Sequence, residues 1–256
     1  MAPGAERSGR GALTVGRFFD PAGGGALQVE LRSEDGTFFA LLRPIAYAAN
    51  EYAEPFVVPA HLRTFRTDFA TVPWVFAWLV PRSGRFLPAA ILHDALVPPG
   101  DYEGPDVTRA QADHIFREAM LALGTGRIRA WLMWSAVTMG TMWTSGRLYW
   151  RTVLVGLLAV TTLLGIVATL DLLDVWNVLP WMGQRPFGVE LATGAVAAVA
   201  IPAALALTWR KFVAAGVITA VALAFLVHVT IVIAALYSLY WIAERVVSGR
   251  GPPYGR

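Results

Sequence analysis

Thr152–Leu170 reads TVLVGLLAVTTLLGIVATL, a run of 19 residues without a charged side chain. A helix needs about 20 apolar residues to cross the hydrocarbon core of a bilayer. Residues 1–151 carry 15 Lys/Arg and 14 Asp/Glu, whereas residues 152–256 carry only 6 and 4. The chain therefore changes at Arg151 from the composition of a water-soluble domain to that of lipid-embedded helices.

Two further segments have the same character. Leu191–Trp209 lacks charges and contains Pro202, which a helix in lipid tolerates. Phe212–Ala243 is interrupted only by His228 and is longer than the hydrocarbon core, so it must tilt or project from it. We therefore predict an all-α transmembrane region over residues 151–247, with spans at 152–170, 191–209 and 212–243 and a tail at 248–256.

The flanking charges predict an orientation. Arg147 and Arg151 precede the first span, and Arg210 and Lys211 separate the second from the third. Positively charged flanks favour the cytoplasmic side. We therefore expect a multi-pass protein of the cytoplasmic membrane with its N-terminal domain in the cytoplasm. The end of the chain after the third span, with Arg245, Arg250 and Arg256, would then lie outside. The short apolar segment 128–143 could be a fourth span, but we expect a domain helix close to the membrane surface.

Composition excludes several classes of site. The sequence has no cysteine, so disulfides, thiolate metal sites and cysteine nucleophiles are absent. No Lys/Arg run is long enough to indicate nucleic acid as a partner. Met1–Arg17 has no apolar core of a signal peptide, so we expect the N-terminal domain to begin in the cytoplasm.

The first part of the chain has the pattern of an α+β domain, residues 27–150. Residues 1–26 are rich in Gly, Pro and Ala, and we expect them to be disordered. A turn at Ser33–Gly36 separates two apolar runs. We predict a small antiparallel sheet followed by helices, with strands at Leu27–Arg32, Thr37–Tyr47 and Glu54–Val58 and helices at Trp74–Val80, Phe86–Leu96, Thr108–Leu123 and Ile128–Trp143. Thr108 is the expected N-cap of its helix, and Gly124 ends that helix.

Two motifs lie in this domain: TDFATVP at residues 67–73 and LHDAL at residues 92–96. A third motif, Arg109 with residues 113–120, lies on the following helix. In order and spacing the three motifs resemble the phage-associated domain of unknown function 1353 family, over about residues 27–144. Thr71 departs from the family pattern, where Ser is common. Residues 97–100 also depart, because an aromatic residue and a Gly-containing turn usually follow the second motif. The motif residues are Thr67, Asp68, Phe69, Ala70, Pro73, His93, Asp94, Arg109, Asp113 and Phe116.

This resemblance implies a phage or phage-tail-like context and no known reaction. Contractile injection systems, which are phage-tail-like, are one setting for a membrane-anchored member of such a family. The expectation is an integral membrane protein whose cytoplasmic domain docks a protein assembly at the cytoplasmic membrane. We expect its partners to be the lipid bilayer and that assembly. The sequence is also compatible with a homo-oligomer.

Four polar side chains of the motifs are candidates for catalysis or metal binding: Asp68, His93, Asp94 and Asp113. A His with several carboxylates can bind a divalent cation, which activates water. The adjacent His and Asp are superficially similar to the HD-type metal phosphohydrolases, in which a separate His and Asp complete the site. Only His61 could supply that separate His. One alternative is therefore a membrane-tethered, metal-dependent hydrolase.

The other alternative is a hydrogen-bonded scaffold, for which we expect no cofactor. Asp68 would then cap the turn that follows it. His93 and Asp94 point about 100° apart if they lie on a helix, so they need not share a ligand. Arg109 and Asp113 are spaced i, i+4 and can pair across one helical turn.

Overall fold

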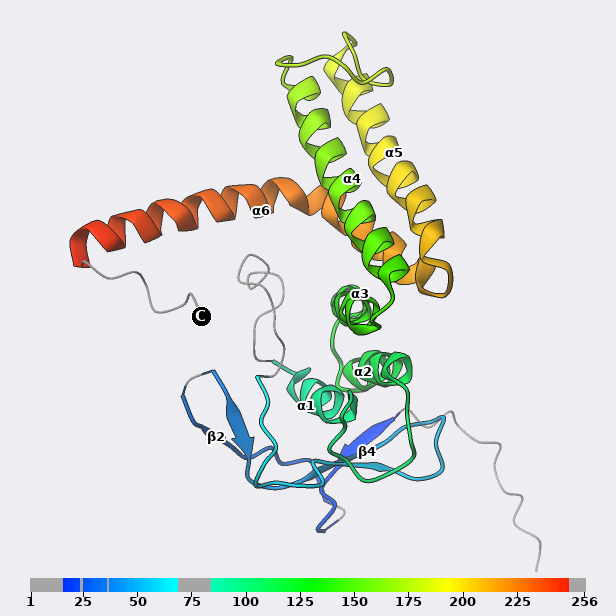
Figure 1. Ribbon diagram of the computed structural model, residues 1–256, viewed down its shortest axis with the longest axis vertical. Coiled ribbons are helices and arrows are strands. Elements are labelled where there is room, and N and C mark those ends of the chain that lie inside the picture. Colours follow the sequence, from blue (N-terminus) through cyan, green and yellow to red (C-terminus); the bar gives the residue numbers. More distant parts are fainter. Residues whose placement is uncertain (1–15, 24, 36, 69–83, 249–256) are drawn as a thin grey trace, which may run out of the picture. The chain divides into compact units, whose positions relative to one another are not determined.

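The computed structural model describes residues 16–23, 25–35, 37–68 and 84–248 (Figure 1). The predicted helix Trp74–Val80 and the motif residues Phe69, Ala70 and Pro73 lie outside these ranges. The chain divides into two compact units. The first comprises Met1–Thr71 and Ser83–Ala130, and the second comprises Val72–Arg82 and Trp131–Arg256.

Short antiparallel strands begin the first unit. One sheet has the order β1-β4-β5, and a second consists of β2 and β3. The predicted strand Thr37–Tyr47 is instead two strands in different sheets. Pro44 lies between them, where it has no backbone N–H to donate to a ladder. The strands are β1 (Arg17–Phe19), β2 (Leu31–Ser33), β3 (Phe39–Leu41), β4 (Ile45–Ala48) and β5 (Phe56–Val58).

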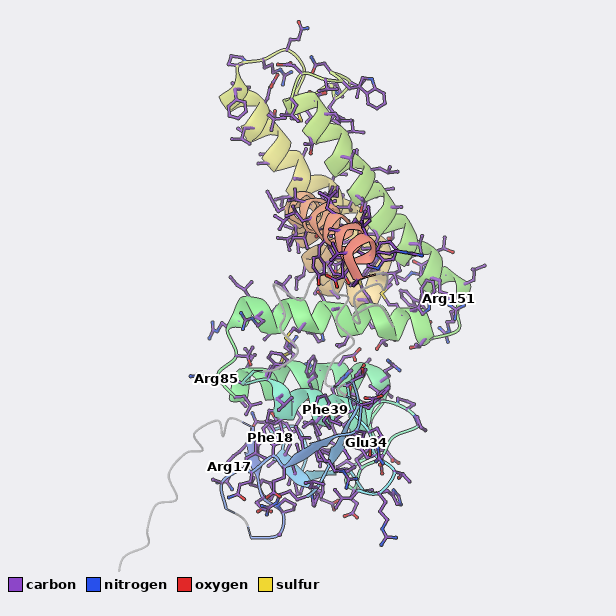
Figure 2. All side chains as sticks on the ribbon, turned by 90° about the vertical axis from the view of Figure 1, so that its left-hand side faces the viewer. Arg17, Phe18, Glu34, Phe39, Arg85 and Arg151 are labelled. Carbon is purple, nitrogen blue, oxygen red and sulfur yellow. The ribbon has the colours of Figure 1, made fainter. Side chains whose placement is uncertain are left out.

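Strand β1 extends the domain toward the N-terminus beyond the predicted boundary at residue 27. Arg17 and Phe18 lie on this strand (Figure 2). Phe18 is buried and pairs with Tyr47 of β4, with ring centroids 4.6 Å apart. The neighbouring Gly and Pro residues suggested disorder, but burial of this aromatic side chain fixes the strand on the sheet.

The predicted turn between the first two apolar runs is confirmed as the turn of the β2–β3 hairpin. Asp35 Oδ1 accepts hydrogen bonds from the backbone N–H groups of Thr37 and Phe38, at 2.8 and 2.7 Å. These two bonds stabilise the carboxylate and lower the pKa of Asp35 below its ordinary value.

Helices α1 (Leu87–Leu96) and α2 (Arg109–Ala122) follow the strands and pack against each other. Thr108 is the N-cap of α2, as predicted, and forms a capping box. Gln111 N–H donates to its hydroxyl, and Thr108 N–H donates to Gln111 Oε1 at 2.8 Å. Gly124 has φ +74°, a conformation that favours glycine and ends the helical run.

The second unit contains the apolar helices. Its elements are α3 (Arg127–Thr144), α4 (Leu148–Leu172), α5 (Phe187–Ala206), the 3₁₀ helix η2 (Leu207–Phe212) and α6 (Val213–Ser248). α4 and α5 lie side by side as a hairpin, and α6 packs against both at its start (Figure 1). Pro202 lies inside α5, as expected of a helix in lipid.

Three helical segments of the described chain are long and apolar enough to cross a membrane: Leu148–Leu172, Phe187–Val227 and Val229–Ser248. The second runs from α5 through the turn at Arg210 into α6, and the third is the remainder of α6. Helices α4, α5 and α6 therefore correspond to the three predicted spans, and the apolar region is all-α.

Two buried carboxylates shape the connector between α4 and α5. Asp171, fully buried, accepts hydrogen bonds from the backbone N–H groups of Val178, Leu179 and Gly183, at 2.9, 2.8 and 3.2 Å. Glu190 accepts one from Arg185 N–H at 2.9 Å. Each carboxylate therefore has donors inside the protein, which offsets the cost of its burial.

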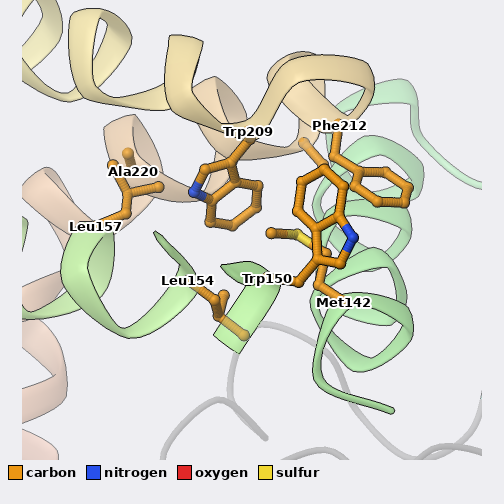
Figure 3. Close-up of a cluster of buried hydrophobic side chains, with 8 residues drawn as sticks. Met142, Trp150, Leu154, Leu157, Trp209, Phe212 and Ala220 are labelled. Atoms are coloured by element: carbon orange, nitrogen blue, oxygen red, sulfur yellow. The ribbon is translucent and has the colours of Figure 1, made fainter. Parts of the chain in front are cut away.

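A cluster of buried side chains joins the end of α3, the start of α4 and η2 at the other end of the hairpin (Figure 3). Trp150 and Phe212 meet edge to face, with centroids 5.2 Å apart. Trp209 is fully buried and donates its indole N–H to Val153 O at 3.3 Å. The members are Met142, Trp150, Leu154, Leu157, Trp209, Phe212, Ala215 and Ala220.

Candidate functional site

Thr67 fixes the first motif at the edge of β3. It forms an antiparallel bridge with Phe39, in which Phe39 N–H donates to Thr67 O at 2.9 Å and Thr67 N–H returns a bond at 3.1 Å. Figure 2 marks Phe39 in the first unit. The Thr67 side chain is buried, so its hydroxyl needs a partner inside the protein.

That partner belongs to the second motif. Thr67 Oγ1 donates to Asp94 Oδ2 on α1 at 2.5 Å. The bond joins residues 27 positions apart and ties the segment after the strands to the first helix. The first two motifs are therefore parts of one site in the folded chain.

His93 joins the second motif to the third. Its Nε2 lies 2.8 Å from Asp113 Oδ1, so the pair crosses from α1 to α2. Both side chains are buried, with 8% of His93 and 1% of Asp113 exposed. The imidazole also packs on the ring of Phe116, with centroids 4.9 Å apart. His93 and Asp94 thus take different partners, as expected for adjacent positions on a helix.

Asp94 is the titrating group of this site. Burial raises the pKa of its carboxyl to about 6, and the nearby charge of Asp68 acts in the same direction. The hydrogen bond from Thr67 and the charge of His93 oppose this shift. Asp94 therefore changes its charge close to neutral pH, unlike an ordinary surface aspartate.

Comparison with known proteins finds a family model that covers these residue pairs. Residues 39–137 match a family model described as "Protein of unknown function (DUF1353)". This segment is a DUF1353 domain. The matched segment runs from β3 into α3 and includes all three motifs, whereas α4, α5 and α6 lie outside it. No curated protein and no solved structure matches the chain.

In the DUF1353 domain, three of the candidate metal ligands take part in two separate hydrogen-bonded pairs. His93 bonds Asp113, and Asp94 bonds Thr67. Among the described residues, no three His, Cys, Asp or Glu side chains form a group that could hold a metal ion. His61, the candidate second histidine, instead bonds Asp101, with Nδ1 and Oδ1 2.8 Å apart.

The remaining motif residues lie close to these pairs in the chain. Asp68 is half-buried and follows the β3 bridge, and Arg109 is half-buried in the first turn of α2. Sequence reasoning named Thr67 as a motif residue but did not predict that its hydroxyl donates to Asp94. The motif itself could have indicated this bond, because a threonine hydroxyl that is buried in the fold needs an acceptor inside the protein.

Tyr47 is a residue that sequence reasoning missed. It lies on β4, is 1% exposed, and burial together with the charge of Glu118 raises its pKa to about 12. The phenol therefore stays neutral at physiological pH. No local pattern marks it, because its burial arises from packing between elements distant in sequence.

Proposed function

We propose that this protein is anchored in the cytoplasmic membrane and that its DUF1353 domain docks a protein assembly from the cytoplasm. The observation that carries this proposal is the direct joining of the domain to the apolar helices. The DUF1353 match ends at residue 137 inside α3, and α4 begins at Leu148. A domain held by so short a connection stays near the bilayer, so its partner must come to it.

The turn that joins α3 to α4 is short and is held by side-chain contacts. Arg151 Nε donates to Trp143 O at 3.0 Å, and the guanidinium lies 5.3 Å from the centre of the Trp143 ring. Gly146, with φ +71°, turns the chain between the helices. These contacts favour a short, ordered turn over a long flexible tether.

The polar network of the domain also favours docking. The hydrogen bonds Thr67–Asp94 and His93–Asp113 are made within the protein, between groups that are buried or half-buried. Such bonds specify how α1, α2 and the strand region fit together. The motifs therefore serve as a scaffold that presents a surface.

The proposed partner is a phage-tail-like assembly, such as a contractile injection system. This choice rests on the resemblance of the motifs to a phage-associated family. Positively charged residues flank the first span and the turn between the second and third, which supports the cytoplasmic placement of the domain.

Site-specific photo-crosslinking in living cells tests the docking proposal. A crosslinking residue is placed in the full chain at exposed Arg63 or Asp106 of the DUF1353 domain, and at exposed Asn177 of the connector as the matched control. We expect tail or baseplate-like components to be captured from the first two positions and not from the third. Capture of only abundant proteins, or equal capture from all three positions, would contradict the proposal.

A metal-dependent hydrolase is the second candidate, favoured by the effect of the Asp68 charge on Asp94. To hold a divalent cation with Asp68, His93, Asp94 and Asp113, the last three side chains would have to leave the hydrogen-bond partners that they have in this structure. The purified full-length protein should then contain stoichiometric metal that His93→Ala removes. Elemental analysis that finds no stoichiometric metal in the unaltered protein would exclude this candidate.

A further inference from the structure

Four cations lie at one end of the α4–α5 hairpin: Arg147, Arg151, Arg210 and Lys211. All four are exposed, and they come from the α3–α4 turn, the first turn of α4, and η2. Figure 2 shows Arg151 at the start of α4. We call this group the basic end of the bundle.

No acidic residue is close to the basic end in the sequence. There is no Asp or Glu between residues 119 and 170, or between residues 191 and 243. At the opposite end of the hairpin, Asp171 and Glu190 are buried and hydrogen-bonded to the connector backbone. The exposed charges of the connector are Asp174 and Arg185, one of each sign. The net positive charge of the bundle is therefore exposed at the basic end.

Packing holds the two sources of these cations together. Tyr149 Oη donates to Thr208 O at 2.7 Å, which links the start of α4 to η2. Beneath them, Trp150, Trp209 and Phe212 belong to the buried cluster of Figure 3. The positions of the four cations are therefore fixed by the fold of this unit and do not depend on flexible loops.

Two of these cations, Arg210 and Lys211, rest on aromatic rings. The Arg210 guanidinium lies 5.2 Å from the centre of the Tyr149 ring, and Lys211 Nζ lies 4.9 Å from that of Phe212. A cation on a ring face keeps donors that can point away from the ring. Arg210 also has φ +50°, a strained conformation for a residue other than glycine, which turns the chain between α5 and α6.

We propose that the basic end of the bundle binds the headgroup phosphate of an anionic phospholipid. The inference rests on the membrane embedding proposed above. Because α4 begins at this end and η2 joins α5 to α6 there, the cations lie where apolar helices meet water. Headgroup phosphates occupy that level, and aromatic residues favour it as well. Exposed cations between membrane helices complement the negative charge of such lipids.

Lipid retention by the purified full-length protein tests this inference. Detergent-solubilised protein is mixed with equal amounts of phosphatidylglycerol and phosphatidylcholine with identical acyl chains, and retained lipid is measured by native mass spectrometry. We expect phosphatidylglycerol to be enriched. Each cation removed by Arg→Gln or Lys→Gln should weaken that enrichment about fivefold.

Three variants make the result specific. The double variant Arg210→Gln, Lys211→Gln should lose most of the enrichment, whereas Arg210→Lys should retain it because the charge remains. Arg63→Gln is the control, since Arg63 is an exposed cation of the DUF1353 domain and lies outside the apolar helices. It should bind phosphatidylglycerol like the unaltered protein.

Equal retention of the two lipids by the unaltered protein would overturn the inference, whether or not the variants fold. Unchanged enrichment in the double variant would overturn it too. Raising the salt concentration should reduce the enrichment, because screening weakens exposed charge interactions. Failure here would leave the crosslinking result unaffected, so the lipid inference and the docking proposal can fail separately.

Discussion

His93 and Asp113 are the residues on which the DUF1353 domain depends most. Each is buried and bonds the other, so removing one leaves the other without this bond in an apolar site. We expect His93→Ala to destabilise the protein by about 3 kcal/mol, seen as a lower Tm of the detergent-solubilised full chain. His61→Ala is the control, because the His61 side chain is 77% exposed and its ion pair is worth about 1 kcal/mol or less. Equal losses in the two variants would contradict this account.

Asp94 should make the stability of the domain depend on pH. Its pKa is about 6 in the folded protein against an ordinary value of 3.8, so the folded state holds the proton more tightly. The stabilisation is complete below about pH 4 and is lost as the pH rises through about 6. Asp94→Asn, which keeps an oxygen acceptor for Thr67, should remove this loss.

Thermal unfolding between pH 4 and pH 7 measures the effect. The Tm of the unaltered protein should fall relative to that of Asp94→Asn over this range. The corresponding loss in the free energy of unfolding should be about 3 kcal/mol at most. Parallel Tm profiles for the two proteins would show that Asp94 does not titrate in this range.

The sequence indicated which residues form the site, but it did not indicate which of them bond to one another. His93, Asp94 and Asp113 were recognised from the motifs, and the opposite directions of His93 and Asp94 followed from helix geometry. The pairing of His93 with Asp113 could not be predicted, because it depends on how α1 packs on α2. The hydrogen bond from Thr67 was not predicted for the same reason, since its acceptor lies on another element.

Among the elements, α2 is the helix whose start is most clearly encoded. Thr108 and Gln111 form a reciprocal capping box. We expect Thr108→Ala to lower the free energy of unfolding by about 1 kcal/mol. Thr144→Ala is a matched control, because the exposed Thr144 hydroxyl donates to a carbonyl at the end of α3 and caps no helix start. Denaturant unfolding compares the two, and an equal or larger loss in Thr144→Ala would refute the role of the cap.

Helices were predicted more accurately than strands for a physical reason. Caps and apolar spacing are local, so α1, α2 and α3 lie within a residue or two of their predicted bounds. The strands have only three or four residues, too few for a clear alternation, and their existence depends on distant partners. Strand β1 was therefore missed, and the break at Pro44 was read as continuous strand.

For the whole molecule, the central proposal is that the apolar helices span the membrane and hold the DUF1353 domain on its cytoplasmic side. α6 has 36 residues and is about 54 Å long, well above the roughly 30 Å of the hydrocarbon core. Its second part, Val229–Ser248, is apolar and unburied within the described chain. Near the end of this part, the Arg245 guanidinium lies over the ring of Trp241. Such aromatic residues favour the headgroup layer of a membrane.

Cysteine labelling in intact cells tests this claim most directly, because the sequence has no cysteine of its own. Single substitutions Arg63→Cys, in the DUF1353 domain, and Asn177→Cys, in the α4–α5 connector, are placed at exposed positions of the full chain. A membrane-impermeant maleimide should label Asn177→Cys in intact cells and Arg63→Cys only after the membrane is permeabilised. Labelling of Arg63→Cys in intact cells, or of both positions only after permeabilisation, would contradict the proposed orientation.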